Sequence, residues 1–256
     1  MTETANSLRS GLTWRAHGSG LPVTLVAPGL GATQGEARIP ASGLAGTRVV
    51  LTLPSHGDAP DAPDGYWTYP TIAADLAEVA DRVEATRAVG VSLGSGALTR
   101  LLAEQGDRFD RVALLLPAAL DRPRSTPAVW ALERMADAVD AHDLAGLREL
   151  VAGELPPGVP VGDYVEARTA ALTRLAAALR TLPEQSPLTD AAALADVRTP
   201  VLVIAATGDP LHPEEVARAT ARALPAARFE ALPSPAPLIT HRREVRALLT
   251  GFLDGA

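Results

Sequence analysis

The sequence predicts an α/β fold in which helices cover both faces of a mostly parallel sheet. Short aliphatic runs, such as residues 22–31 and 111–119, alternate with longer amphipathic stretches, such as residues 68–85. This alternation is typical of βαβ units with buried parallel strands. Apolar residues make up 47% of the 256 residues and charged residues 21%, a composition that allows one large core and disfavours global disorder.

The alternation of strands and helices is interrupted once. The expected strands are residues 22–31, 47–57, 85–92, 111–119, 199–210 and 226–233. The expected helices are residues 68–85, 93–106, 128–152, 164–182, one that starts at Pro213 and one that ends the chain. Residues 120–195 contain only Ala- and Leu-rich helical patterns. The sequence therefore predicts a core of residues 1–119 and 196–256, with a helical cap of residues 120–195 inserted between two strands.

Composition disfavours several classes of function. The formal net charge of −7 argues against nucleic acid or an anionic membrane as a partner. The absence of cysteine excludes disulfides and thiolate catalysis, and no histidines have metal-ligand spacing, so we expect neither metal nor cofactor. The N-terminus lacks the pattern of a signal peptide, and no apolar run could span a bilayer. We expect a cytoplasmic protein with a small-molecule substrate; the sequence predicts no oligomeric state.

Residues 90–94, Gly-Val-Ser-Leu-Gly, match the pattern G-x-S-x-G. The motif ends an expected strand and opens an expected helix, which is the setting of a nucleophile elbow. The sharp turn exposes the serine hydroxyl above the helix N-terminus, where free N–H groups favour a developing negative charge. Ser92 is therefore the candidate nucleophile, and a plain Gly-Ser turn is the alternative.

Together with two further motifs, the expected elbow at residues 90–94 gives the sequence a resemblance to the α/β-hydrolase superfamily. The segment APGLGAT (27–33) is similar to the oxyanion loop of that family, and TGDPLHP (207–213) is similar to its acid loop. The order of the motifs also agrees, and the helical insertion stands where the family carries its cap. The resemblance implies an α/β-hydrolase fold over almost the whole chain.

The resemblance also implies roles for particular residues. The N–H groups of Leu30 and Leu93 would bind the oxyanion, with Gly29 beside them, and Asp209 would be the acid of a catalytic triad. Two alternatives stay open. Asp209 lies in a Gly-Asp-Pro sequence that suits an ordinary turn, and the glycines near Leu30 would also permit a tight turn without any oxyanion role.

The histidine of the triad is not where the family usually has it. That position falls near residues 235–237, which contain no histidine. The nearest one is His241, and we predict it as the catalytic base, with a buried packing or capping residue as the alternative. His56 ends its strand on the same sheet edge as Ser92, and we predict it near the substrate, although a structural turn histidine is favoured. His212 precedes Pro213 and reads as a helix start close to Asp209.

These features predict a serine hydrolase that cleaves an ester, thioester or lactone of a small to mid-sized, fairly apolar metabolite. The alternative is a lyase or cyclase that keeps the fold but lacks the usual base, and a third possibility is a ligand-binding relative without catalysis. Trp130, Leu132 and Met135 are candidate pocket-lining residues of the cap, with cap-to-core packing as the alternative. A dinucleotide-binding fold is disfavoured because residues 28–35 lack the full G-x-G-x-x-G pattern.

Overall fold

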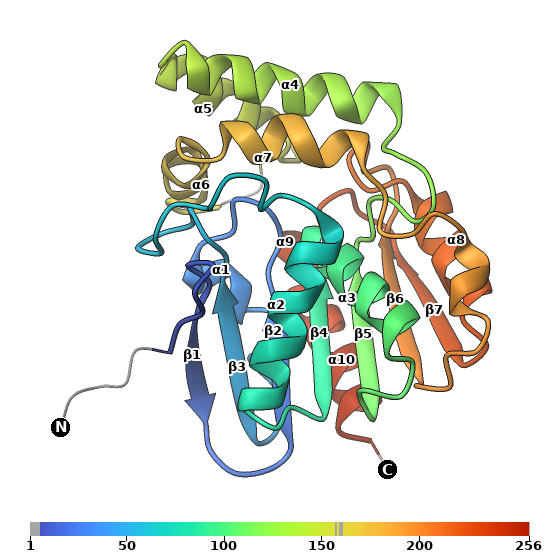
Figure 1. Ribbon diagram of the computed structural model, residues 1–256. Coiled ribbons are helices and arrows are strands. Elements are labelled where there is room, and N and C mark those ends of the chain that lie inside the picture. Colours follow the sequence, from blue (N-terminus) through green and yellow to red (C-terminus); the bar gives the residue numbers. More distant parts are fainter. Residues whose placement is uncertain (1–5, 157, 159–160, 256) are drawn as a thin grey trace, which may run out of the picture.

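A seven-stranded sheet forms the centre of the protein (Figure 1). The computed structural model describes residues 6–156, 158 and 161–255. The strand order is β1-β3-β2-β4-β5-β6-β7, and β1 alone is antiparallel to its neighbour. The strands are β1 (Thr13–Gly18), β2 (Val23–Ala27), β3 (Thr47–Thr52), β4 (Arg87–Val91), β5 (Arg111–Leu115), β6 (Val201–Ala206) and β7 (Ala227–Leu232).

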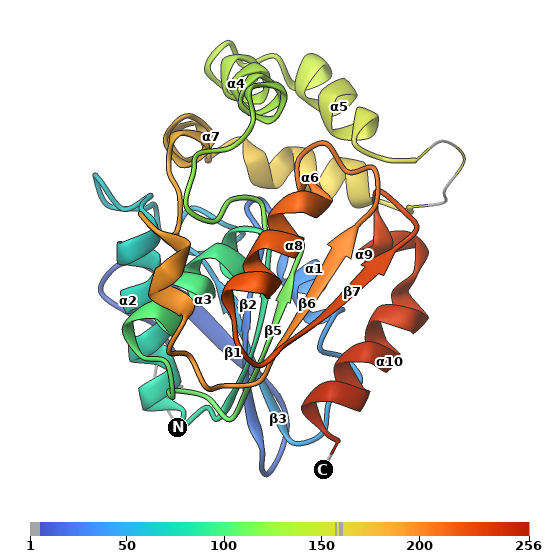
Figure 2. The ribbon, with the colours of Figure 1, turned by 90° about the vertical axis from the view of Figure 1, so that its right-hand side faces the viewer.

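Helices cover both faces of this sheet, as the apolar strands require (Figure 2). One face packs against α2 (Tyr69–Arg82), α3 (Leu93–Glu104) and α8 (Glu214–Ala223). The other packs against α1 (Gln34–Arg38) and α10 (Arg242–Leu253), with the short α9 (Pro237–Thr240) before α10. Neighbouring strand residues alternate between the two cores, because successive side chains point to opposite faces: Leu25 lies in the first core and Val26 in the second.

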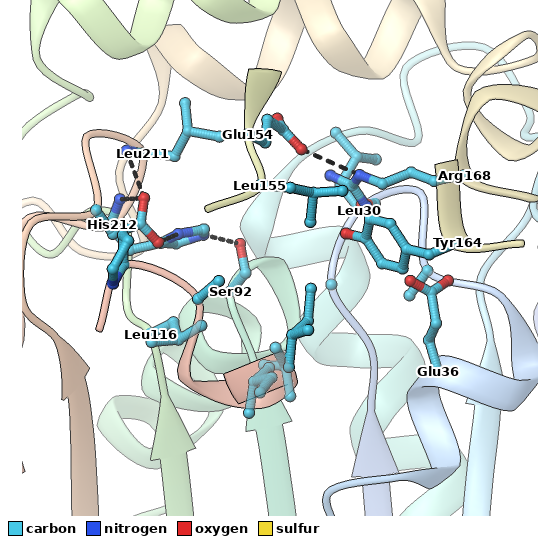
Figure 3. Close-up of a pocket in the computed structure, with 18 of the residues that line it drawn as sticks. Leu30, Glu36, Ser92, Leu116, Glu154, Leu155, Tyr164, Arg168, Leu211 and His212 are labelled. Carbon is cyan, nitrogen blue, oxygen red and sulfur yellow. Dashed lines mark hydrogen bonds and ion pairs between the residues drawn. The ribbon is translucent and has the colours of Figure 1, made fainter. Parts of the chain in front are cut away.

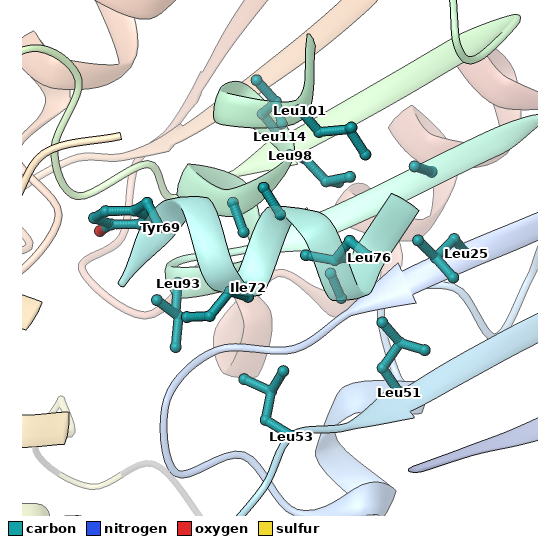
Figure 4. Packing of buried hydrophobic residues seen from close by; sticks show 14 of the residues in the cluster. Leu25, Leu51, Leu53, Tyr69, Ile72, Leu76, Leu93, Leu98, Leu101 and Leu114 are labelled. Atoms are coloured by element: carbon teal, nitrogen blue, oxygen red, sulfur yellow. The ribbon is translucent and has the colours of Figure 1, made fainter. Parts of the chain in front are cut away.

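The larger core holds the helix that follows the motif at residues 90–94. Leu25 and Leu51 from the sheet, Ile72 and Leu76 from α2, and Leu98 from α3 are all fully buried (Figure 4). Each such side chain contributes about 2 kcal/mol by leaving water. This packing fixes α3 against the sheet and so holds its N-terminus at the carboxyl end of β4.

The expected fold class is confirmed: the sheet is mostly parallel and helices flank it. All six expected strands form, but most end several residues early, and the residues beyond them make turns. The edge strand β1 was not expected. Only Trp14 of its six residues is buried, so the strand lacks a clear hydrophobic pattern. His17 lies in β1 opposite Arg48 of β3.

Between β5 and β6 the described residues form helices and no strand. They are α4 (Thr126–Asp140), α5 (Leu144–Gly153), α6 (Tyr164–Leu172), α7 (Ala176–Thr181) and two short 3-10 turns, η1 (Leu182–Glu184) and η2 (Ala191–Leu194). We call residues 126–181 the cap; it lies above the carboxyl ends of the strands (Figure 1). The turn η2 instead packs against α3 and α8 of the core.

One helix expected over residues 128–152 is two helices in the structure. His142 adopts a positive φ of 55°, which breaks the helical path. The side chain of Asp143 then caps α5 by accepting the N–H of Gly146 at 2.8 Å. No described helix has the length and apolar character needed to cross a membrane.

Candidate active site

Ser92 lies at a strained turn between β4 and α3. Its φ of 50° and ψ of −107° are outside the regions that residues with a side chain normally occupy. The N–H of Ser92 donates to the carbonyl oxygen of Leu115 at 2.9 Å, which fixes the turn to β5. Strain of this kind persists only where the surrounding structure imposes it, and it is concentrated at functional sites.

The two glycines of the motif allow the turn to pack closely. A Cβ on Gly90 would lie 2.6 Å from the carbonyl oxygen of Gly94, and a Cβ on Gly94 would overlap the carbonyl oxygen of Ala27 in β2. Both contacts are with backbone, which has little freedom to move aside. The sequence Gly-x-Ser-x-Gly is therefore needed for α3 to start directly against β2 and β4.

The imidazole of His212 lies between Ser92 and Asp209, and Figure 3 shows its ring facing the Ser92 hydroxyl. His212 Nε2 is 2.8 Å from Ser92 Oγ, and His212 Nδ1 is 2.7 Å from Asp209 Oδ2. His212 and Asp209 both belong to the loop that follows β6. Asp209 Oδ1 accepts the backbone N–H groups of Leu211 at 2.8 Å and His212 at 3.2 Å, so the carboxylate is fixed within its own loop.

These contacts set the protonation pattern of the three groups. Burial alone raises the pKa of Asp209, but the hydrogen bonds from the His212 ring and from two backbone N–H groups outweigh it and lower the pKa. The ionised carboxylate accepts the Nδ1 proton of His212, which leaves Nε2 free to accept the hydroxyl proton of Ser92. The arrangement is able to deprotonate the serine as it attacks an electrophile.

The turn of residues 29–32 lies beside Ser92 and presents one free N–H. A Cβ on Gly29 would lie 3.5 Å from Ser92 Cβ. Of the four polar groups in the two peptide bonds from Gly29 to Gly31, three have partners. The carbonyl of Gly29 accepts the N–H of Ala32, the carbonyl of Leu30 accepts from Arg168, and the N–H of Gly31 donates to His56.

The fourth group, the N–H of Leu30, has no hydrogen-bond partner among the described residues, and the same is true of the N–H of Leu93 at the start of α3. Leu30 and Gly29 line the cavity above Ser92. Two unpaired N–H groups, one in the turn beside the serine and one on the residue that follows it, are the kind of donors that an oxyanion requires.

His56 supports this turn through a hydrogen bond to its backbone and does not line the cavity. Its ring is 1% exposed and packs against Trp67. Nδ1 lies 2.9 Å from the carbonyl oxygen of Pro54, and Nε2 accepts the N–H of Gly31 at 2.9 Å. Burial is the main cause that lowers its pKa to about 4, so the ring stays neutral and keeps its acceptor. The structure thus makes His56 a structural residue of the turn and corrects its predicted place at the substrate.

The structure does not bring His241 to Ser92. His241 is the residue before α10, and its Nδ1 bonds the Thr240 hydroxyl at 2.8 Å. It does not line the cavity, and the ring at Ser92 Oγ is that of His212. The prediction of His241 as the base is therefore wrong on geometry: Ile239 and Arg242 on either side of it in sequence line the cavity, but the His241 ring is bonded to Thr240 instead.

The predicted cap residues also lie elsewhere. Trp130 is 62% exposed on α4, whereas Leu132 and Met135 are buried in the larger core. None of the three lines the cavity. The helix that faces Ser92 is α6, and α4 packs behind it against α7.

A cavity of about 450 Å³ opens above Ser92, within the range of small-molecule sites. Its wall is mostly apolar and includes Ile39, Leu116, Leu155, Leu238 and Ile239. Opposite Ser92, a polar group from the cap and α1 faces the cavity (Figure 3): Glu36, Glu154, Tyr164 and Arg168. None of these four residues was predicted from the sequence, since nothing in their local sequence distinguishes them from ordinary surface residues.

A strained serine at the strand–helix turn of a parallel sheet, with a cap over the carboxyl ends of the strands, is the arrangement of α/β hydrolases. The family model described as "Alpha/beta hydrolase family" matches residues 16–247. The chain belongs to this family. Among curated proteins, no sequence matches the chain.

Several solved structures share the fold of this chain. A hydrolase from Pseudomonas aeruginosa is 24% identical, with a TM-score of 0.77 and full coverage of both chains. An enol-lactonase from Burkholderia xenovorans is 21% identical, with a TM-score of 0.74 over 95% of this chain and 96% of that one. A carboxylesterase from Bacillus subtilis is 13% identical, with a TM-score of 0.80 over 98% of this chain and 91% of that one.

Proposed function

We propose that the protein is a serine hydrolase that cleaves an ester, thioester or lactone of a small to mid-sized, fairly apolar compound. The observation that carries the proposal is the chain of hydrogen bonds from Ser92 Oγ through His212 to Asp209, at 2.8 and 2.7 Å. A base in contact with a strained serine is the requirement for covalent acyl transfer.

In the proposed reaction, Ser92 Oγ attacks the carbonyl carbon while its proton passes to His212 Nε2. The carbonyl oxygen becomes an oxyanion that the N–H groups of Leu30 and Leu93 bind. The C–O or C–S bond to the leaving group then breaks, and His212 returns the proton to the departing oxygen or sulfur. A water molecule then attacks the acyl carbon while His212 Nε2 takes its proton. The bond from the acyl carbon to Ser92 Oγ breaks, and His212 returns the proton to Ser92 Oγ.

The cavity supports the proposed substrate class. Its volume of about 450 Å³ suits a compound of small to medium size, and its mostly apolar wall includes several leucines, isoleucines and prolines. Among the solved structures of similar fold are an enol-lactonase and a carboxylesterase, whose names state that they act on an enol-lactone and on carboxylic esters. The lyase or cyclase alternative depended on a missing base, and His212 beside Ser92 removes that reason.

The test combines labelling with turnover. We expect a fluorophosphonate probe to label the wild-type protein at Ser92, and p-nitrophenyl esters of short to medium acyl chains to be hydrolysed. Ser92→Ala should abolish labelling and reduce kcat by about 10⁵-fold or more, because members of a triad act as a unit.

Ser95→Ala is the matched control, three residues further along α3. The Ser95 hydroxyl is buried and has no hydrogen-bond partner in the described part of the chain, so its removal should leave labelling and kcat unchanged. A wild-type protein that neither reacts with the probe nor turns over any ester, thioester or lactone would refute the proposal.

A further inference from the structure

The cap helix α6 contacts the backbone of the turn at residues 29–32. Gly31 has a positive φ of 74°, and a Cβ there would lie 2.8 Å from Cδ2 of Leu172 and 3.3 Å from Nη1 of Arg168. Both neighbours belong to α6. The close approach is possible because residue 31 is glycine, and it places α6 directly against the segment that carries the Leu30 N–H.

Arg168 makes a specific bond across this contact. Its Nη1 donates to the carbonyl oxygen of Leu30 at 3.1 Å, and its Nε donates to Glu154 Oε2 at 3.2 Å (Figure 3). The Arg168 and Glu154 side chains are 18% and 19% exposed. Burial alone lowers the pKa of Arg168, but the neighbouring Glu154 carboxylate outweighs it and raises the pKa, so the guanidinium stays charged.

The peptide bond between Leu30 and Gly31 is thus held at both ends by different parts of the fold. Arg168 binds its carbonyl from the cap, and His56 binds its N–H from the core. The carbonyl of Gly29 is taken by the N–H of Ala32 within the turn. With these groups fixed, the turn has one orientation, and the N–H of Leu30, a residue that lines the cavity, is the group of this turn left without a partner among the described residues.

We propose that Arg168 is a positioning residue for the oxyanion donor Leu30, so that docking of the cap helix α6 completes the oxyanion hole. The inference rests on the proposed function, since it assigns the Leu30 N–H to an oxyanion. Arg168 itself does not touch the reacting atoms; it acts through the carbonyl of Leu30.

A second cap arginine separates this role from general anchoring of the cap. Arg174 follows α6, donates to the carbonyl oxygens of Gly57 and Ala59 at 3.1 and 3.0 Å, and pairs with Asp61. It joins the cap to the core as Arg168 does, but its hydrogen bonds and its ion pair go to residues 57–61 and not to residues 29–32. Arg174→Gln is therefore the matched control for Arg168→Gln.

The experiment measures kcat and KM with p-nitrophenyl butyrate, and the affinity for an alkyl boronic acid, whose adduct with Ser92 is tetrahedral. We expect Arg168→Gln to lower kcat by about ten- to a hundredfold and to weaken boronate binding in parallel, with KM changed less than about threefold. Losing a whole oxyanion donor lowers kcat by about 10² to 10³, and misplacing one should lower it less. Arg174→Gln should change all three quantities less than about threefold.

Arg168→Lys keeps the charge but cannot reproduce the fork that bonds Leu30 and Glu154 together. It should lose less kcat than Arg168→Gln and serves as the test if the Gln variant does not fold. In Arg168→Ala, millimolar guanidinium should restore part of kcat, which a purely structural role would not allow.

Equal kcat for the Arg168→Gln and Arg174→Gln variants, or a loss confined to KM, would overturn the inference while the hydrolase proposal stands. A wild-type protein without probe labelling or turnover would overturn both. The two failures are distinguished by the wild-type measurement alone.

Discussion

The Asp209 carboxylate binds three donors, and all three belong to its own loop. They are the N–H groups of Leu211 and His212 and the Nδ1 proton of the His212 ring. The loop therefore supplies by itself the three donors that hold the carboxylate facing the proposed base. Asp209 and His212 are three residues apart, a separation at which a tight turn brings the side chains together.

Replacing each candidate base tests this assignment. We expect His212→Ala to lower kcat by about 10⁴- to 10⁶-fold, because Ser92 loses the group that takes its proton. His241→Ala should change kcat less than about threefold, since the His241 ring contacts Thr240 and does not reach the cavity. The measurement is steady-state hydrolysis of a p-nitrophenyl ester, with circular dichroism to confirm folding. Comparable losses in the two variants would contradict the assignment.

The sequence allowed Ser92 and Asp209 to be predicted because each lies in a local motif at the end of a strand. His212 lies in such a motif too, yet its neighbours Pro213 and Glu214 also signal a helix start, and α8 does begin there. The spacing Asp-x-x-His in one loop was the available signal. The role of Arg168 could not be predicted from the sequence, because its hydrogen bond to Leu30 joins residues 138 positions apart.

The start of α3 depends on close backbone packing, and a pair of glycine substitutions measures how much. Gly94→Ala should lower the free energy of unfolding by about 1–3 kcal/mol, because its Cβ would overlap the carbonyl of Ala27. Gly251→Ala in α10 has open space around the new Cβ and should raise that free energy by about 0.5–1 kcal/mol. Urea denaturation of both variants checks the pair, and a neutral Gly94→Ala would show that the elbow relaxes freely.

A strong apolar pattern made most of the strands predictable. The five parallel strands β2 to β6 are largely buried, so each reads as an aliphatic run. The two edge strands each have one buried residue, and of these two β7 was expected and β1 was not. The break between α4 and α5 was missed because it depends on the positive φ of His142 and the cap at Asp143, which leave the Ala- and Leu-rich pattern unchanged.

Buried His56 makes the stability of the folded protein depend on pH. Burial lowers its pKa to about 4, against 6.5 in the unfolded chain. Between these values the unfolded state binds a proton that the native state does not, so stability falls as the pH is lowered through this window. The difference is worth roughly 3 kcal/mol at pH 4.

His56→Gln removes this titration while keeping a side chain that can accept a hydrogen bond. We expect the wild-type protein to lose roughly 3 kcal/mol more stability than His56→Gln between pH 7 and pH 4, measured by urea denaturation. His142→Asn is the control, because His142 is exposed and asparagine accepts its positive φ. Parallel pH profiles for His56→Gln and the wild-type protein would show that another group carries the dependence.

All three proposed catalytic groups precede Pro213, although the chain continues through α8, β7, α9 and α10. The later segment still supplies part of the cavity wall, through Pro235, Leu238 and Ile239. Recombination with a homologous gene at this boundary would therefore exchange one wall of the cavity and leave the nucleophile, base and acid in their original parent. We expect such an exchange to change which compounds fit the cavity, while the three proposed catalytic groups stay together.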